Sequence, residues 1–381
     1  MTTPLRRRIL FFVNSTVRGG VEEVVLSLVR NLPRDRFEAH LAAPTALLER
    51  LAGDLDVPGL QVFPTELRSW RQWREIRELV SYLRRNKIEI VNSHLFCSTF
   101  LAAPLARFAG VPCVVETCHG PESWRRSWLK RSCLVDRAIE LFVTLNISVS
   151  EANLHYLRRT KGYPARKLRV VPNGRDLSGY DSVPQEKVSE LRDRLGLSDG
   201  DRAAVVVGRL EEQKGHRYLL EALSSLVSVW PSFKVVLVGE GSLRSELQAQ
   251  CARLHLEQHV VFAGQQADVR PFYSLAEFVI LPSLYEGMPL VAIEAGAAYR
   301  AIIATAVDGT VEVVEPGKTG LLVPKASPEH LAAAISDLLA HSRKAKGMGR
   351  EARKRIHILF SLERQIAETA RLFEEFAPSH A

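Results

Sequence analysis

The sequence predicts an α/β protein built from two doubly wound parallel sheets in separate domains. With 381 residues, the chain exceeds the size of one ordinary hydrophobic core. Short β-branched or aromatic runs alternate with segments of helical length, which is typical of βαβ units. A polar, turn-rich stretch over residues 175–202 interrupts this alternation. We therefore expect an N-terminal domain over 1–180, a C-terminal domain over 181–360, and a final amphipathic helix over 361–377 that packs back on the first.

Thirteen runs are expected to form strands, and most of them end in polar residues or glycine. Ligands of open α/β sheets bind beyond the carboxyl ends of the strands, so these endings are where a site is expected. The first domain supplies the runs 8–15, 37–43, 60–64, 88–94, 112–119, 141–150 and 168–174. The second supplies 203–208, 234–239, 260–264, 277–283, 301–305 and 320–324.

Composition excludes several classes of protein. Hydrophobic residues make up 46% and charged residues 25%, as in ordinary globular proteins. No apolar run reaches the length of a membrane span, and the basic, apolar N-terminus reads better as a first buried strand than as a signal peptide. The five cysteines are scattered without a C-x-x-C pair, and the histidines include no H-E-x-x-H pair. We expect a cytoplasmic protein with no disulfide framework, no bound metal and no cofactor.

Charge is unevenly distributed along the chain. Residues 1–175 contain 28 Lys and Arg against 16 Asp and Glu, a net charge of +12, whereas the remainder carries −4. This asymmetry suggests that the first half faces something anionic. Nucleic acid is disfavoured as that partner, because no recognised module or stacking platform is present.

Two glutamates stand out in the segment LYEGMPLVAIEAGAAYR, residues 284–300. Glu286 lies in a loop broken by glycine and proline, and Glu294 lies on the helix that should follow. Paired carboxylates first suggest glycoside hydrolysis, in which two such groups flank the scissile bond. However, Pro289 suits the first turn of a helix, which would place Glu294 on the second turn, facing the space above the strand ends. The start of that helix is then free to hold an anion.

Glycines and cations mark two further strand-to-helix turns. Gly19 and Gly20 follow the first strand, where small residues let a backbone approach a phosphate. An ordinary turn explains this pair equally well. In the second domain, Arg209 and Lys214 surround a glycine-marked turn and suit a diphosphate, with surface solubility as the alternative. The sequence G-E-G at 239–241 is a poor dinucleotide fingerprint, and no Walker A sequence is present.

The segments described above belong to an ordered set of short motifs. The second half contains, in order, V-G-R-L-x4-K-G, V-G-E-G, F-A-G, E-G-M-P-L-V-A-I-E-A and E-P-G-K-T-G-L-L-V-P. The first half contains R-G-G-V-E, His94, H-G at 119–120, S-V-S-E-A-N-L-H-Y-L and V-P-N-G-R-D. In their order and spacing, these motifs strongly resemble glycosyltransferase family 4, the retaining nucleotide-sugar glycosyltransferases of the GT-B fold, which carry the group 1 domain. The resemblance covers nearly the whole chain and implies two Rossmann-like domains that face each other across a cleft.

The resemblance also implies roles for individual residues. Arg209 and Lys214 would contact the donor diphosphate, Glu294 would bind the ribose hydroxyls, and Glu286 would lie beside the transferred sugar. Gly19 and Gly20 would close over the phosphates from the other domain, and His119 would approach the sugar from that side. The implied catalytic residues are His119, Arg209, Lys214 and Glu286. The implied donor-binding residues are Gly19, Gly20, Gly208, Arg209, Lys214, Gly287, Met288, Pro289, Leu290 and Glu294.

Two positions depart from the family pattern. Ala301 stands where many members have proline, and Asp308-Gly309 stands where they have Gly-Gly. These changes affect the expected loop shape near the sugar, and therefore which donor sugar fits.

Two basic, aromatic stretches in the first half are candidates for contact with an anionic membrane. Residues 66–87 place Trp73, Ile76, Val80 and Leu83 on one helical face, and packing of this face on the sheet is the favoured alternative. Residues 121–137 contain Trp124 and Trp128, and plain solvation is as good an explanation there. The inner face of the membrane is the site that such contact would imply.

The function expected from the sequence is transfer of a sugar from a nucleotide-sugar donor, with UDP favoured, to a lipid-linked or cell-surface glycan. The nucleotide sugar is then a substrate and no metal is required. The same fold also leaves open a UDP-N-acetylglucosamine 2-epimerase or a non-catalytic nucleotide-sugar-binding protein.

Overall fold

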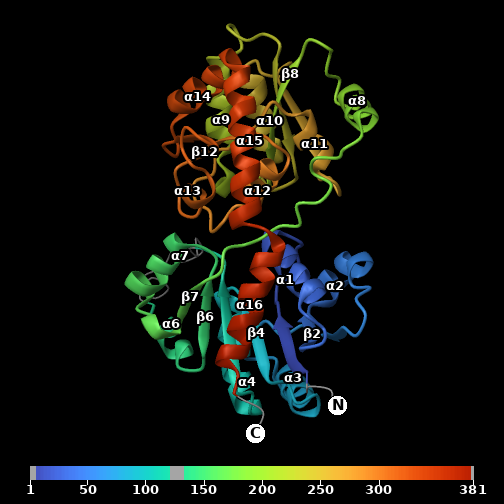
Figure 1. The fold of residues 1–381 in the computed structure, drawn as a ribbon, viewed down its shortest axis with the longest axis vertical. Helices are drawn as coiled ribbons and strands as arrows, with labels where there is room; N and C mark the ends of the chain where they lie inside the picture. The colour runs from blue at the N-terminus through green and yellow to red at the C-terminus, as the bar shows by residue number, and fades with distance from the viewer. Residues whose placement is uncertain (1–5, 121–132, 379–381) are drawn as a thin grey trace. The chain divides into compact units, whose positions relative to one another are not determined.

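The computed structural model describes residues 6–120 and 133–378. It divides into two compact units: Met1–Asn173 together with Leu362–Ala381, and Gly174–Ser361. Figure 1 shows both units as helices packed on a central sheet. The expected α/β class with two doubly wound parallel sheets is confirmed, because each sheet is parallel throughout.

The first unit contains a sheet in the order β3-β2-β1-β4-β5-β6-β7. Its strands are β1 (Arg7–Phe12), β2 (Phe37–Ala43), β3 (Gln61–Pro64), β4 (Ile90–His94), β5 (Cys113–Cys118), β6 (Leu145–Ser148) and β7 (Leu168–Val170). Its described helices are α1 (Gly20–Asn31), α2 (Thr45–Leu51), α3 (Trp73–Arg85), α4 (Phe96–Ala109), α6 (Leu134–Glu140), α7 (Glu151–Tyr156) and α16 (Leu362–Phe376). Every strand overlaps the run expected to form it.

The second unit contains a sheet in the order β10-β9-β8-β11-β12-β13. Its strands are β8 (Arg202–Val207), β9 (Phe233–Val238), β10 (Val260–Gly264), β11 (Phe278–Leu281), β12 (Ala301–Thr305) and β13 (Gly320–Val323). Its helices are α8 (Gln185–Arg194), α9 (His216–Ser224), α10 (Arg244–Arg253), α11 (Arg270–Leu275), α12 (Leu290–Ala297), α13 (Thr310–Val313), α14 (Pro328–Ala340) and α15 (Ser342–Leu359).

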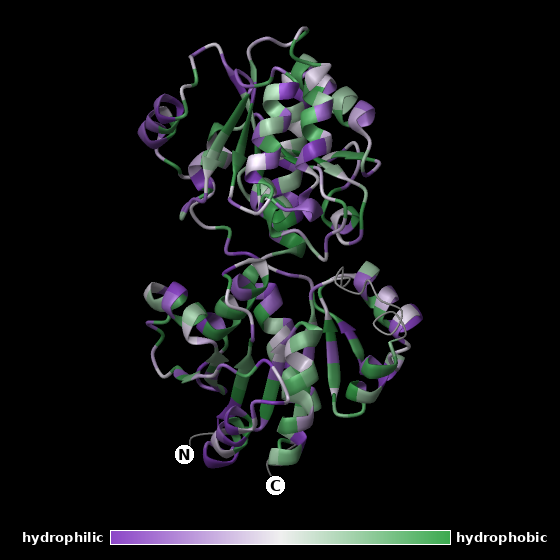
Figure 2. Cartoon of the chain, turned by 180° about the vertical axis from the view of Figure 1, so that it is seen from behind, coloured by the Kyte–Doolittle hydropathy of each residue, from purple (hydrophilic) through white to green (hydrophobic). Residues whose placement is uncertain are grey.

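Both faces of each sheet are covered, because successive strand residues point to opposite sides. In β8, Ala204 and Val206 join one buried cluster, whereas Ala203 and Val205 join another. The strands are accordingly hydrophobic along most of their length, while the helices carry both hydrophobic and hydrophilic residues (Figure 2). Burial on both faces therefore explains why the strands read as nearly continuous apolar runs.

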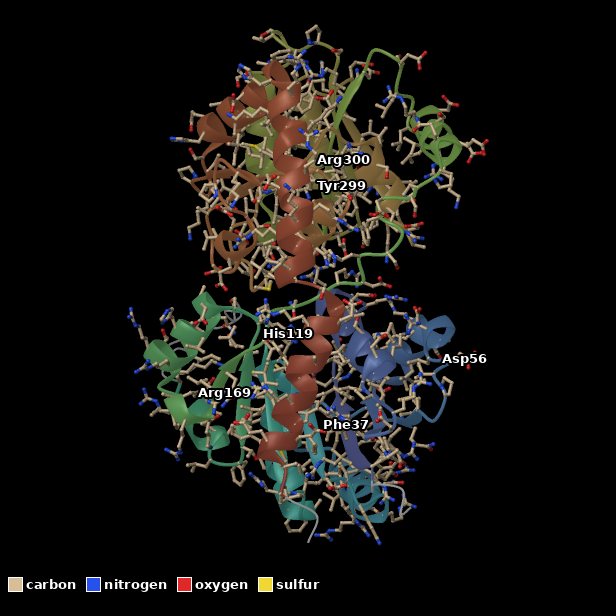
Figure 3. All side chains as sticks on the ribbon, viewed as in Figure 1. Phe37, Asp56, His119, Arg169, Tyr299 and Arg300 are labelled. Atoms are coloured by element: carbon tan, nitrogen blue, oxygen red, sulfur yellow. The ribbon has the colours of Figure 1, made fainter. Side chains whose placement is uncertain are left out.

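Helix α16 completes the first unit although it comes from the end of the chain. It lies alongside α1 (Figure 1). The ring of Phe373 contacts those of Phe11, on β1, and Phe37, on β2 (Figure 3), with centroid distances of 6.5 and 6.3 Å. Phe11 points to this side of the sheet, whereas Leu10 and Phe12 belong to the cluster on the other side.

The strand order reverses at one place in each sheet, between β1 and β4 in the first unit and between β8 and β11 in the second. A ligand is expected at such a switch point, beyond the carboxyl ends of the two strands. The segments that follow β1, β8 and β11 contain Gly19, Arg209 and Glu286, and His94 is the last residue of β4. The fold therefore places these four residues where an α/β sheet binds its ligand.

Candidate active site

Two loops meet at the switch point of the second sheet. One follows β8 and contains Lys214, and the other follows β11 and contains Glu286. The amide of Leu284 donates to the Gln213 carbonyl oxygen at 2.8 Å, and Gln213 Nε2 donates to the Tyr285 carbonyl oxygen at 3.0 Å. Gly215 has a φ of +64°, and a Cβ there would lie 2.1 Å from the Pro282 carbonyl oxygen. Only glycine allows the two loops to approach this closely.

Lys214 and Glu286 form an ion pair where these loops meet. Lys214 Nζ lies 2.5 Å from Glu286 Oε1, and the two side chains are 15% and 7% exposed. Ser283 Oγ donates to the same carboxylate oxygen at 2.7 Å. The structure thus brings together a cation and a carboxylate that the sequence separates by 72 residues. A largely desolvated ammonium at this position can exchange its carboxylate partner for the oxygens of a phosphate.

Asp308 positions the backbone of Glu286, a contact that the sequence did not predict. The Glu286 amide donates to Asp308 Oδ2 at 3.0 Å. Burial is the main cause that raises the pKa of Asp308, and the nearby charge of Glu286 adds to it, while Lys325 acts in the opposite direction. A Cβ on Gly309 would lie 1.9 Å from the Gly287 carbonyl oxygen. The departure from the family pattern at Asp308-Gly309 therefore keeps the glycine that the close approach requires.

Glu294 lies on α12, and each of its carboxylate oxygens has a partner. Tyr273 donates its hydroxyl to Oε2 at 2.8 Å, and Arg175 Nε lies 2.8 Å from Oε1. Glu294 is only 5% exposed, so these partners largely enclose its carboxylate. An ionised carboxylate has about four acceptor positions, so Glu294 retains capacity for further hydroxyl donors. Burial, followed by the charge of Glu294, raises the pKa of Tyr273, which keeps its phenol protonated as a donor.

The first turn of α12 supplies backbone donors beside this carboxylate. Pro289 is the N-cap rather than a residue of the first turn, and it makes no side-chain capping bond. Met288 and Pro289 are buried, whereas Gly287 and Leu290 are partly exposed. The helix start therefore combines free N–H groups with the positive end of the helix dipole.

Arg209 differs from Lys214 because it is exposed and forms no ion pair among the residues that the structure describes, although its charge interacts with that of Glu211. It follows Gly208, whose φ is +156° and whose amide donates to the Val238 carbonyl oxygen at 2.9 Å. A Cβ on Gly239 would lie 2.0 Å from the Gly208 carbonyl oxygen. The glycines thus support the backbone of this loop, and Arg209 extends from it into solvent.

In the first unit, Gly19 and Gly20 begin α1, with Gly19 as the N-cap. The Gly19 amide donates to Glu22 Oε2 at 2.9 Å, and Ser15 Oγ donates to the other oxygen of Glu22. Arg18 is held at 2.6 Å by Glu23 and at 2.6 Å by Asp54. The glycine pair is therefore anchored by its neighbours, and the preceding arginine is already neutralised.

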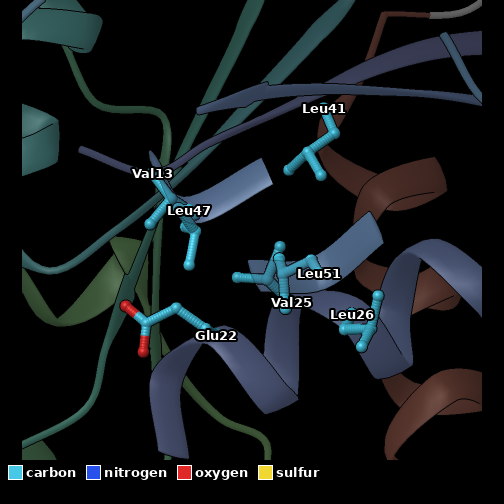
Figure 4. A pocket seen from close by; sticks show the side chains of 7 residues that line it. All are labelled: Val13, Glu22, Val25, Leu26, Leu41, Leu47 and Leu51. Atoms are coloured by element: carbon cyan, nitrogen blue, oxygen red, sulfur yellow. The ribbon is translucent and has the colours of Figure 1, made fainter. Parts of the chain in front are cut away.

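A small hollow in the first unit is lined by Glu22 and six apolar residues (Figure 4), namely Val13, Val25, Leu26, Leu41, Leu47 and Leu51. The Glu22 carboxyl group points to the side of the hollow away from Leu26. Since its one charged group is already hydrogen-bonded, the hollow offers nothing that would bind a phosphate or a sugar.

His94 and His119 lie at the ends of neighbouring strands β4 and β5 (Figure 3 labels His119). His94 Nδ1 and His119 Nε2 are 2.9 Å apart. His94 is fully buried, whereas His119 is partly exposed. Burial lowers the pKa of His94 well below its ordinary value and that of His119 to about 4. Both imidazoles are therefore neutral at physiological pH.

The basic, aromatic stretches differ from expectation in one residue. Val80 and Leu83 pack in the core together with Leu79, as the packing alternative predicts. Trp73 shares the helical face of Val80 by its spacing, but it begins α3 and is 67% exposed, so it does not pack in the core with the others. Trp124, Trp128 and the rest of 121–132 lie outside the described residues. Among the described helices, none is long and apolar enough to cross a membrane.

Four partners in the second unit were not predicted as site residues: Arg175, Tyr273, Ser283 and Asp308. Arg175 belongs to the motif V-P-N-G-R-D, which was a signal available in the sequence. Ser283 follows β11 directly, and Asp308 was visible only as a departure from the family pattern. Tyr273 lies on α11 and carries no sequence signal that links it to Glu294.

Two family models match the chain in succession. The one described as Glycosyltransferase Family 4 matches residues 18–178, and the one described as Glycosyl transferases group 1 matches residues 187–355. The chain belongs to glycosyltransferase family 4. The family 4 assignment agrees with the two parallel-sheet units, which are those of the GT-B fold, and makes the protein a glycosyltransferase.

Individual relatives of this family 4 glycosyltransferase are similar over most of their length. The chain is 29% identical over 319 residues to an Escherichia coli UDP-Gal:alpha-D-GlcNAc-diphosphoundecaprenol alpha-1,3-galactosyltransferase, covering 80% of this chain and 81% of that protein. It is 31% identical over 265 residues to a Mycobacterium tuberculosis GDP-mannose-dependent alpha-(1-6)-phosphatidylinositol monomannoside mannosyltransferase, covering 67% of each.

Among solved structures, Anabaena HepE in complex with UDP and glucose superimposes with a TM-score of 0.84 at 22% identity, covering 97% of this chain and 100% of that one. WaaG, a glycosyltransferase involved in lipopolysaccharide biosynthesis, gives a TM-score of 0.73 at 15% identity, with coverage of 96% and 99%. At these identities the likeness supports the fold.

Proposed function

We propose that this protein is a retaining glycosyltransferase that transfers a sugar from a nucleotide-sugar donor, with UDP as the favoured nucleotide, to a lipid-linked or cell-surface glycan. The observation that carries the proposal is the Lys214–Glu286 pair at the switch point of the second sheet, with Arg209 on the same loop. Lys214, Arg209 and the start of α12 provide positive charge for a diphosphate. Glu294 provides acceptors for ribose hydroxyls.

Breaking the bond between the sugar and the phosphate leaves a nucleoside diphosphate with added negative charge. Stabilisation of this charge by fixed cations and helix N–H groups is then the main catalytic contribution of the second unit. Lys214 exchanges part of its ion pair with Glu286 for a contact with the phosphate. Arg209, on the same loop, contacts the phosphate as well. In this proposal the cations take the place of a metal ion, so added chelator should leave turnover unchanged.

The retaining stereochemistry is proposed without a carboxylate nucleophile. Glu286 is paired with Lys214 and accepts a hydrogen bond from Ser283, and both contacts weaken it as a nucleophile. The acceptor hydroxyl instead attacks on the face from which the phosphate leaves, and a phosphate oxygen takes its proton. Glu286 orients the sugar by accepting hydrogen bonds from its hydroxyls.

The relatives favour more than one donor, since one is named for UDP-Gal and another for GDP-mannose. A thermal-shift panel of UDP-, GDP- and ADP-sugars therefore tests the donor, because a ligand that binds the native state raises Tm. We expect UDP-sugars to give the largest shift and Lys214→Ala to reduce it. A matched control is Lys318→Ala, which removes an exposed lysine of the same unit that pairs with Glu315.

The reaction type is tested with the donor that binds. Transfer predicts turnover only with a lipid-linked or glycan acceptor, and NMR of the product should show the same anomeric configuration as the donor. An inverted product would contradict the retaining mechanism. Conversion of UDP-N-acetylglucosamine without acceptor would identify an epimerase, and binding without turnover in the presence of extracted lipid-linked acceptors would identify a binding protein.

We also propose a cytoplasmic location with peripheral contact to the inner face of an anionic membrane. The five cysteines, all within the described residues, form no disulfide with one another, as expected in a reducing compartment. Trp73 is exposed, and the guanidinium carbon of Arg77 lies 5.9 Å from the centroid of its ring. In and beside α6, at least half of the surface of three apolar residues is exposed, namely Leu134, Val135 and Leu141. Exposed apolar side chains beside cations suit a bilayer interface.

Co-sedimentation with anionic vesicles, compared with neutral vesicles, tests this contact. Leu134→Ser combined with Leu141→Ser should reduce binding to anionic vesicles, whereas Val229→Ser changes an exposed apolar residue of the second unit and serves as the control. Equal binding of all variants, or no preference for anionic lipid, would contradict the proposal.

A further inference from the structure

Asn92, His94 and His119 form a continuous hydrogen-bonded chain in the first unit. His94 Nε2 lies 2.9 Å from Asn92 Oδ1, and His94 Nδ1 lies 2.9 Å from His119 Nε2. The two imidazole centroids are 5.2 Å apart with 27° between the ring planes, so the rings meet edge to edge. Asn92 and His94 are fully buried, and the partly exposed end of the chain is His119.

The direction of the chain follows from the surroundings of Asn92. Its Nδ2 lies 2.9 Å from Thr117 Oγ1 and 3.4 Å from the Val115 carbonyl oxygen. A carbonyl group can only accept, so the amide nitrogen must face Val115 and the amide oxygen must face His94. A flipped amide would place two acceptor oxygens against each other in a buried site, which is costly.

This orientation determines where each proton resides. Asn92 Oδ1 can only accept, so His94 Nε2 carries a proton and donates it. A neutral imidazole has a single N–H, which leaves His94 Nδ1 without a proton and makes it the acceptor for His119 Nε2–H. His119 Nδ1 is consequently unprotonated, with a lone pair that no described residue occupies.

The backbone next to this chain is strained, which indicates that the arrangement is maintained against a cost. Leu95 follows His94 and has a φ of +70° with a ψ of 148°, a conformation that residues with a Cβ rarely adopt. Its amide donates to the Thr117 carbonyl oxygen at 3.2 Å. Strain of this kind is concentrated at functional sites, and here it fixes the end of β4 from which His94 projects.

We propose that Asn92 and His94 are positioning residues that fix His119 as its Nε2–H tautomer, so that His119 Nδ1 accepts a hydrogen bond from a hydroxyl group of the ligand. A neutral histidine in this state contributes an acceptor and no charge, which suits a sugar or glycan hydroxyl. The tautomer follows from the first unit alone. That the ligand is a sugar rests on the proposed function.

NMR of the ¹⁵N-labelled full chain tests the tautomer directly, since protonated and unprotonated ring nitrogens resonate far apart. His119 signals are assigned by their loss in His119→Gln. At neutral pH we expect His119 to show a protonated Nε2 and an unprotonated Nδ1. A protonated Nδ1 on His119, or an imidazolium, would overturn the proposal.

Two substitutions of Asn92 separate positioning from mere packing. Asn92→Asp has nearly the same shape but places a carboxylate beside His94, which favours a protonated His94. His94 Nδ1 would then donate to His119 Nε2, so the proton of His119 should move to Nδ1. Asn92→Leu removes the acceptor, so both tautomers of the histidine pair become populated and the Nδ1 signal moves to an averaged position. His40 is the internal reference, because it is buried on β2 and its Nδ1 is paired with Tyr82 at 2.7 Å. If Asn92→Leu does not fold, the His119 spectra of the wild type and of Asn92→Asp still test the proposed tautomer.

Kinetics add a second readout once a donor is known. Asn92→Leu should lower kcat by roughly tenfold to a hundredfold, since loss of the correct histidine tautomer impairs its role, with the donor KM within about twofold. Asn92→Asp, which is expected to move the proton of His119 to Nδ1, should lower kcat as well. If NMR shows the predicted tautomer but the protein turns over no nucleotide sugar, the proposed function is refuted. The assignment of the tautomer then still holds.

Discussion

The two units present different electrostatics at the carboxyl ends of their sheets. The second unit carries ionic groups there, with Lys214 paired to Glu286 and Arg175 paired to Glu294. The first unit presents the neutral pair His94 and His119, whose pKa values are lowered by burial. The difference suggests that the second unit suits a charged ligand group, whereas the first unit suits neutral hydroxyl groups.

Two arginines make the contrast concrete. Arg18 and Arg209 both follow the first strand of their unit and precede a helix. Arg18 is held by Glu23 and Asp54, whereas Arg209 forms no ion pair with a carboxylate within the described part of the chain. The first half of the sequence has the larger positive charge, yet of these two arginines the one available to an anion lies in the second half. Net charge over half a chain therefore does not locate a phosphate site.

The largest expected effect concerns acid stability, and it tests the neutral character of the first unit. His119 has a pKa of about 4 when folded and an ordinary value near 6.5 when unfolded. Between these values the unfolded chain binds more protons, so stability is lost as pH falls from about 6.5 to about 4. His94 acts in the same direction. His119 alone should cost the first unit about 2 kcal/mol between pH 7 and pH 5, and His94 adds to this loss.

The second unit provides the comparison for this prediction, because it contains His216, whose pKa burial and then Lys214 lower to about 4. A loss on the order of 1 to 2 kcal/mol is expected there. Hydrogen exchange measured by mass spectrometry, corrected for intrinsic rates, reports both units in the same sample. If both units lose the same free energy of unfolding between pH 7 and pH 5, the predicted difference in acid stability between them is wrong.

The second prediction tests whether the ionic groups also support the fold. Glu294→Ala leaves Arg175 without its carboxylate and Tyr273 without its acceptor, in a site where Glu294 is 5% exposed. Breaking a buried ion pair is costly, and we expect the second unit to lose about 3 kcal/mol of stability. Glu294→Gln keeps an acceptor for Tyr273 and should lose less. Glu315→Ala, at a partly exposed pair with Lys318, should lose less than about 1 kcal/mol.

The third prediction concerns the cations directly. Lys214→Ala removes a charge-assisted contact to phosphate and leaves Glu286 unpaired, so the affinity for UDP should fall roughly tenfold to a hundredfold. Arg209→Ala should lower it by about tenfold. Isothermal calorimetry measures both. Arg18→Ala is the matched control, and a loss as large as that of Arg209→Ala would show that the contrast between the two arginines is wrong.

These tests depend on contacts that differ in how far the sequence could predict them. The strands were predictable because burial on both faces of a parallel sheet produces apolar runs such as 203–208. Each run ends in polar residues or glycine where the strand reaches the exposed carboxyl edge of the sheet. The closeness of Lys214 and Glu286 was predictable only through the switch-point rule and the family resemblance. The local sequence pattern places Lys214 and Glu286 each in a loop after a strand, but it does not predict that their side chains are in contact.

The partners of Glu294 show where prediction from sequence stops. Helical periodicity placed Glu294 on the second turn of α12, but its surroundings come from α11 and from Arg175, far away in the sequence. The same holds for Trp73, which shares a helical period with Val80 and Leu83 yet lies on the first residue of α3, beyond the sheet-facing part. Side-chain partners supplied by distant elements are set by tertiary packing, which no spacing along the chain encodes.

The smallest expected effect concerns Asp308, whose carboxylate accepts the Glu286 amide hydrogen bond. Its φ of +34° favours glycine, so Asp308→Gly relieves backbone strain while removing the hydrogen bond. We therefore expect stability to change by less than about 1 kcal/mol, because the two effects offset each other. Turnover should nevertheless fall about fivefold, since loss of one hydrogen bond of about 1 kcal/mol loosens the position of Glu286.

Asp308→Asn separates the two contributions, because its amide oxygen still accepts from Glu286 and it carries no charge. The pKa of Asp308 is raised in the folded protein, which means that folding disfavours the ionised form and that stability decreases as pH rises through the raised pKa. Removing the charge should make Asp308→Asn slightly more stable than the wild type at pH 7 and equal to it at low pH. Its turnover should match that of the wild type. Urea unfolding at both pH values and steady-state kinetics measure these outcomes. A fall in turnover equal to that of Asp308→Gly would assign the effect to the lost charge rather than to the position of Glu286.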